Sequence, residues 1–143
     1  MARLPRWACF VLAGYVIGFA DGTGDHVRWM LHGAIHAYPV SYPPVPIQVL
    51  FVGLLVLDPV PAVLTGLTRH EGVWLACAIM VADMIANWTG NLARITSPQG
   101  PLLDTVPWLI TIFGLFVLGT ALPMTPVLRR ADATGTVSPF QAA

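Results

Sequence analysis

The chain has 143 residues, of which 56% are hydrophobic and only 10% are charged, with equal numbers of acidic and basic side chains. Soluble proteins carry a charge on about a quarter of their residues, so this composition excludes an ordinary soluble domain and indicates a protein embedded in a lipid membrane. The net charge of zero gives no reason to expect nucleic acid as a partner. The absence of lysine excludes chemistry through a lysine Schiff base.

Four apolar segments are long enough to cross a bilayer as helices, because about 20 helical residues span a hydrocarbon core roughly 30 Å thick. In chain order they cover residues 6–24, 46–67, 72–92 and 106–127. We therefore predict an all-α fold in which a single domain, residues 1–130, holds four transmembrane helices in an up-down bundle. Residues 131–143 are mostly small or polar, and we expect them to form a disordered cytoplasmic tail.

The placement of arginine predicts the orientation of these helices, since positively charged loops tend to stay in the cytoplasm. Five of the seven arginines fall on the side of the two termini: Arg3, Arg6, Arg69, Arg129 and Arg130. We expect a multi-pass protein of the cell membrane with both termini in the cytoplasm.

The first segment is apolar from Trp7 to Ala20 and is followed by Asp21. Gly14 and Gly18 stand four residues apart, a small-x-x-x-small spacing that lets another helix approach closely. This spacing favours either close packing inside the bundle or a dimer of two copies.

The stretch between the first two segments, residues 25–38, predicts a short helix at the outer membrane surface. It contains His26, and one of its faces carries Asp25, Arg28, His32 and His36. His32 and His36 have a spacing that suits zinc or copper. Histidines at an interface are more often polar anchors, so we expect no metal and no other cofactor. In a second interpretation this face folds over the mouth of the membrane site and supplies a histidine to the two acids, with His36 as a ligand-binding residue.

The second segment is interrupted at its centre by Asp58-Pro59-Val60-Pro61. A proline removes a backbone hydrogen bond and kinks a helix, and two prolines so close together free backbone carbonyls where little water is present. We expect an intramembrane cavity at this break.

Two acids occupy the centres of the second and third segments. A short turn near residues 68–71 makes these segments an antiparallel hairpin, and Asp58 and Asp83 are nearly equidistant from that turn. At 1.5 Å per residue each acid lies roughly 18 Å from the turn, near the bilayer midplane. A carboxyl at that depth costs about 2.5 to 3.5 kcal/mol on insertion scales, so each acid is a functional-site hypothesis. Whether the two side chains face each other depends on helix rotation, which the sequence leaves open.

Asn87 follows Asp83 by four residues and therefore shares its helical face, and Trp88 follows by five. If Asp58 faces this polar stripe, the two carboxyls hold one proton between them, because adjacent carboxylates in a low-dielectric site do not both ionise cheaply. The alternative is purely structural: the acids bridge neighbouring helices and bind the carbonyls that the prolines free.

In its arrangement, the chain resembles the EXPERA-type membrane proteins, a family that includes the sterol isomerases and the sigma-2 receptor. The features that carry the resemblance are Asp21 at the end of the first segment, the proline-broken second segment and the polar third segment. It covers residues 7–127, and the family's glutamates and histidines within the spans have no counterpart here. The resemblance implies a cavity for a sterol-like or terpenoid molecule that opens sideways to lipid, with carboxylates that steady a cationic ligand or intermediate.

The residues and the resemblance together predict a small integral membrane protein that binds a hydrophobic small molecule. If it is an enzyme, we expect an isomerase or cyclase in which the candidate catalytic residues are Asp58 and Asp83, either of which serves as the general acid/base while Asn87 orients the reacting groups. The candidate ligand-binding residues are Asp21, Asn87, Trp88 and His36, with Trp88 as an aromatic wall for a positive charge. Two alternatives stay open: proton or cation conduction by a homo-oligomer, and a structural subunit that pairs with another membrane protein.

Overall fold

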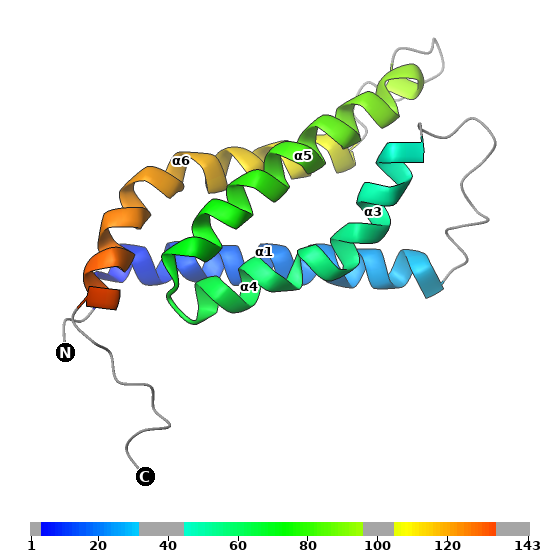
Figure 1. The fold of residues 1–143 in the computed structure, drawn as a ribbon. Helices are drawn as coiled ribbons and strands as arrows, with labels where there is room; N and C mark the ends of the chain where they lie inside the picture. Colours follow the sequence, from blue (N-terminus) through cyan, green and yellow to red (C-terminus); the bar gives the residue numbers. More distant parts are fainter. Residues whose placement is uncertain (1–3, 32–44, 96–104, 134–143) are drawn as a thin grey trace.

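The computed structural model describes residues 4–31, 45–95 and 105–133, and these parts of the chain are almost entirely helical (Figure 1). The helices are α1 (Arg6–Leu31), α3 (Val45–Leu57), α4 (Pro59–Gly66), α5 (His70–Ile95) and α6 (Thr105–Ala133). Four stretches are long and apolar enough to cross a membrane: Arg6–Arg28, Val45–Gly66, His70–Gly90 and Pro107–Ala131. The prediction of four membrane-length helices is confirmed, and these helices indicate a multi-pass membrane protein. Helix α6 continues three residues into the segment that was expected to be a tail.

The first helix is longer than the sequence predicted. α1 runs without interruption through residues 25–31, which were expected to begin a separate surface helix, so the predicted helix end at residue 24 is wrong. Thr23 donates a hydrogen bond to the carbonyl of Phe19 (2.8 Å), and Arg28 forms an ion pair with Asp25 one turn earlier (2.7 Å). Such local contacts stabilise the continuing helix. Residues 32–38, the rest of the expected surface helix, lie outside the described residues.

The second apolar stretch consists of two helices that meet at Asp58, as the proline pattern predicted. Pro59 and Pro61 have no N–H to donate to the carbonyls four residues before them. The Asp58 N–H still donates to the carbonyl of Leu54 (2.9 Å), but the bond from Ala62 N to Asp58 O is 3.5 Å long. Because the helical hydrogen bonds are weakened at Asp58, α3 departs from the direction of α4 (Figure 1).

A tight turn joins α4 to α5, as the short linker predicted. Thr68 has a left-handed backbone (φ 59°), and its N–H donates to the carbonyl of Thr65 (2.9 Å). The N–H of Arg69 donates to the carbonyl of Leu64 (2.8 Å), so the turn has the hydrogen bonds of a Schellman motif. Gly72 is buried against α4, where a Cβ would lie 2.6 Å from Leu64 Cβ and 2.9 Å from the Thr65 nitrogen. The hairpin therefore depends on a glycine at this position.

Two glycines of α1 provide room for aromatic rings of α6. A Cβ at Gly14 would lie 2.9 Å from the ring of Phe116, and a Cβ at Gly18 would overlap the ring of Phe113. The spacing of Gly14 and Gly18 thus serves packing within one chain. Helix α5 packs mainly against α6, while α1 packs mainly against α4.

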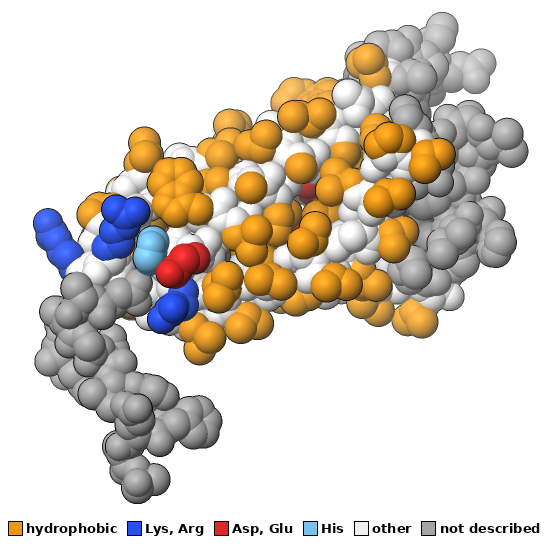
Figure 2. All heavy atoms as spheres, in the orientation of Figure 1, with side chains coloured by type: hydrophobic (Ala, Val, Ile, Leu, Met, Phe, Trp, Pro, Cys, Tyr) orange, Lys and Arg blue, Asp and Glu red, His pale blue; other side chains and the backbone are white. Residues whose placement is uncertain are grey.

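Basic side chains gather at one end of the molecule (Figure 2). The start of α1, the α4–α5 turn and the end of α6 all lie at this end (Figure 1), and they carry Arg6, Arg69, Arg129 and Arg130. Near the other end of α1, the charge of Arg28 is matched by its ion pair with Asp25.

Candidate functional site

The carboxyl of Asp58, at the break between α3 and α4, is the centre of the candidate site. Asp58 is only 6% exposed. His26 of α1 places its Nε2 atom 3.6 Å from Asp58 Oδ2, and the His26 side chain is 23% exposed. This distance is longer than a direct hydrogen bond but suits an ion pair when the imidazole is protonated. A partly exposed histidine therefore faces a buried acid.

Gly22 makes room for this carboxyl on the α1 side. A Cβ at residue 22 would lie 3.1 Å from Asp58 Oδ2, closer than a side chain comfortably sits. Because glycine has no Cβ, the acid can lie against the backbone of α1. On the α3 side, the ring of Phe51 lies 6.4 Å from the ring of His26, centroid to centroid.

The second acid, Asp83 of α5, is held by Asn87 one turn later on the same face. Asn87 Nδ2 donates to Asp83 Oδ1 (2.9 Å) and also to the Asp83 carbonyl (3.1 Å). The carboxyl of Asp83 lies within electrostatic range of the carboxyl of Asp58. Within the described residues the two acids interact through their charges, and no hydrogen bond joins their side chains.

The charges of Asp58, Asp83 and His26 do not cancel when all three side chains are ionised. If both carboxyls are ionised, their charge of −2 exceeds the single positive charge of a protonated His26. The site therefore favours either one proton shared by the acids or one positive charge from outside.

Among the described residues, the Asp58 side chain makes no hydrogen bond, whereas every fully enclosed side-chain nitrogen or oxygen has a partner. The Asp58 oxygens are therefore not completely enclosed. Figure 2 shows acidic atoms recessed among hydrophobic side chains in the middle of the face formed by α3, α4 and α5. An acidic group is thus reachable from an apolar surface.

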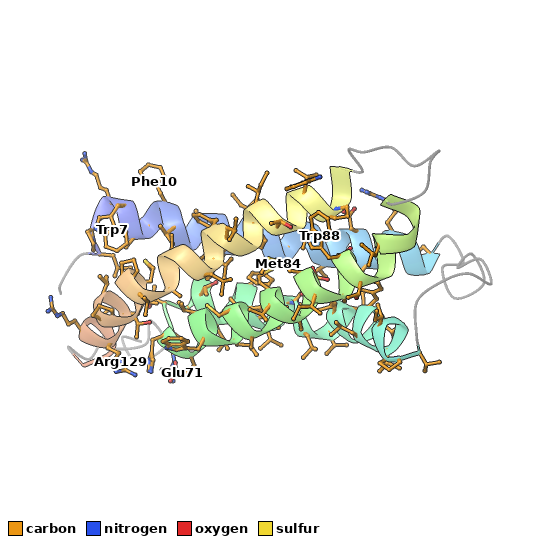
Figure 3. The ribbon with its side chains drawn as sticks, turned by 90° about the horizontal axis from the view of Figure 1, so that it is seen from above. Trp7, Phe10, Glu71, Met84, Trp88 and Arg129 are labelled. Atoms are coloured by element: carbon orange, nitrogen blue, oxygen red, sulfur yellow. The ribbon has the colours of Figure 1, made fainter. Side chains whose placement is uncertain are left out.

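Trp88 contacts α6 rather than the acids. Its Nε1 donates to Thr111 Oγ1 (2.8 Å), and its ring meets that of Trp108 edge-on with centroids 5.2 Å apart. Figure 3 shows Trp88 and Met84 on the side of α5 that faces α6. The described contacts of Trp88 are those of a packing residue, and the role of an aromatic wall at the acids stays a prediction.

The other predicted site residues are dispersed. Asp21 is exposed on α1, on a different side of that helix from Gly22 and His26. His32 and His36 lie outside the described residues. In residues 4–31, 45–95 and 105–133, no group of three or more His, Cys, Asp or Glu side chains is arranged to hold a metal ion.

Sequence reasoning allowed a histidine of residues 25–38 to reach the acids but did not single out His26 as the neighbour of Asp58, because it ended the first segment at residue 24. The signal was present in the spacing of Tyr15, Phe19, Gly22 and His26, which follow one another at intervals of four, three and four residues. That spacing is typical of one helix face. Tyr15 and Phe19 are both buried, which indicates that this side of α1 faces the other helices along its length as far as His26.

The four apolar helices indicate a multi-pass membrane protein, and its second apolar stretch has a buried acid, Asp58, at a helix break. No protein-family model, curated protein or solved structure matches the chain.

Proposed function

We propose that the protein binds a hydrophobic small molecule at Asp58 and that this molecule carries one positively charged or proton-donating group. The observation that supports this most is the buried carboxyl of Asp58, which faces His26 at 3.6 Å, makes no side-chain hydrogen bond within the described residues and lies in an apolar helix pair. A ligand with an apolar body and a single positive group complements both properties. Small-molecule sites typically combine an apolar lining with a few placed polar groups.

The direction of α3 supports entry of this ligand from the bilayer. α3 turns away at Asp58, and the acidic atoms recessed in the apolar face of Figure 2 are surrounded by side chains that suit lipid. A molecule dissolved in the hydrocarbon core could then reach an acidic group of the site without crossing water.

We place the four helices across the cell membrane as an up-down bundle with both termini in the cytoplasm. The gathering of Arg6, Arg69, Arg129 and Arg130 at one end supports this orientation, since positive charge favours the cytoplasmic side. The pairing of Arg28 with Asp25 lowers the net positive charge at the opposite end.

The resemblance in arrangement to EXPERA-type proteins favours a sterol-like or terpenoid ligand. If the protein is an isomerase or cyclase, we assign the acid/base role to Asp58. Asp83 is already engaged by Asn87, whereas the Asp58 carboxyl makes no side-chain hydrogen bond within the described residues. A carboxyl in this position is available to exchange a proton with a ligand.

Photo-cross-linking tests the location of the ligand. With p-benzoylphenylalanine in place of Phe51, beside His26, irradiation should attach one small molecule of defined mass. The same replacement at Leu109, which is 64% exposed on α6, is the control and should capture only bulk lipid. Identical masses at both positions would count against a ligand at the break.

Proton movement is a second candidate function, favoured by the sequence of titratable groups from His26 to Asp58 to Asp83. If the protein conducts protons, His26→Gln and Asp58→Asn should each abolish pH equilibration in liposomes, measured with an enclosed fluorescent pH indicator. Asp21→Asn, on the exposed side of α1, should leave the rate unchanged. A rate that is the same in all three variants and in the wild type would eliminate this candidate.

A further inference from the structure

Asp21 is an acid that the proposed ligand site does not use. Its side chain is exposed on α1 and makes no hydrogen bond or ion pair with the described residues. The adjacent Gly22 lies against Asp58, so Asp21 is at about the depth of the buried site. Arg28, at the end of the apolar stretch, is seven residues away, roughly 10 Å along the helix.

With the helices placed across the membrane as proposed above, an exposed carboxyl at this depth faces lipid. Charged side chains within transmembrane helices almost always face a protein interior or pair with another group. Lysine and arginine can extend to the membrane surface, but the side chain of aspartate is too short to cover that distance. The nearby Asp25 is paired with Arg28 (2.7 Å), so Asp21 differs from its neighbour in having no partner in the described chain.

The surface around Asp21 is suited to close contact with a second helix. Four other exposed residues share this side of α1: Ala13, Ile17, Ala20 and Gly24. A Cβ at Gly24 would meet no atom within 4 Å, so this glycine is not required by packing inside the chain. Small residues let helix backbones approach each other in a membrane. We call these five residues the Asp21 face.

We propose that the Asp21 face binds a transmembrane helix of another protein, and that this helix carries a lysine or arginine at the depth of Asp21. The charges on this side of α1, from Asp21, Asp25 and Arg28, sum to −1. Two copies of the chain would bring two negative faces together, whereas a basic side chain supplies the opposite charge. This interaction is separate from ligand binding at Asp58.

A designed peptide tests the proposed partner chemistry. The probe is a leucine-rich transmembrane peptide of about 20 residues with one lysine at the depth of Asp21, and the control peptide has leucine there. Energy transfer in liposomes would be measured to the full-length protein labelled at Cys9, which is exposed, whereas Cys77 is buried. We expect the lysine peptide to bind roughly threefold to tenfold more tightly than the leucine peptide, as intramembrane polar pairs do.

Variants of the protein separate this interaction from the ligand site. Asp21→Asn should remove the preference for the lysine peptide, while Asp58→Asn should preserve it. Equal binding of the two peptides, or a lysine preference that survives in Asp21→Asn, would overturn the proposal. Energy transfer between two copies of the protein that is lost in Asp21→Asn would also overturn it, in favour of a homodimer.

Discussion

An Asp58→Asn variant should fold like the wild type and retain its ligand roughly tenfold to a hundredfold less tightly. Hydrogen bonds to charged groups contribute about 1.5 to 3 kcal/mol, which corresponds to that change in affinity. Asparagine has the shape of aspartate, so it fits beside Gly22 and His26. What it removes is the negative charge that the positive group of the ligand is proposed to meet. The bound ligand can be extracted and quantified against protein by mass spectrometry.

Asp21→Asn is the matched control for this experiment, because it makes the same chemical change on the exposed side of α1. It should keep the ligand at the wild-type level. Equal retention in Asp58→Asn and the wild type would remove Asp58 from the site, and equal loss in both variants would point to a general effect of charge.

Gly72→Ala should lower the free energy of unfolding by about 1 to 3 kcal/mol, the usual cost of forcing extra volume into a packed interior. The new methyl group would lie 2.9 Å from the Thr65 nitrogen and 3.0 Å from the Leu64 carbonyl carbon, and backbone atoms cannot move aside as a flexible side chain can. The α4–α5 hairpin would have to open. Because Asp58 and Asp83 lie on opposite arms of this hairpin, ligand retention should fall as well. Unfolding in mixed detergent micelles, followed by circular dichroism, measures the stability.

Gly119→Ala provides the control for the glycine substitution. A Cβ at Gly119 meets no atom within 4 Å, so alanine should be neutral or slightly stabilising through its higher helix propensity. If Gly72→Ala proves as stable as Gly119→Ala, α4 and α5 do not pack as closely as described.

Features set by local chemistry were predictable from the sequence. Hydropathy located the four apolar helices, and the missing N–H groups of Pro59 and Pro61 located the break at Asp58. The spacing of four residues placed Asn87 on the face of Asp83, where its amide binds the carboxyl. Each of these inferences needs only a few neighbouring residues.

Features that depend on packing between helices were not predictable in the same way. Apolar character breaks at Asp21, so the first segment was expected to end at residue 24, yet α1 continues and brings His26 to Asp58. The rotation of α5 sends Trp88 toward α6, although it follows Asn87 directly. Both outcomes depend on which side of a helix meets its neighbour, and the sequence of one helix alone does not specify this.

The most direct test of an acidic ligand site within the membrane is native mass spectrometry of the wild-type protein, purified in mild detergent. The account predicts one apolar adduct of defined mass that stays bound when the detergent and loosely held lipid are removed. A well-folded chain that carries no such adduct would contradict it.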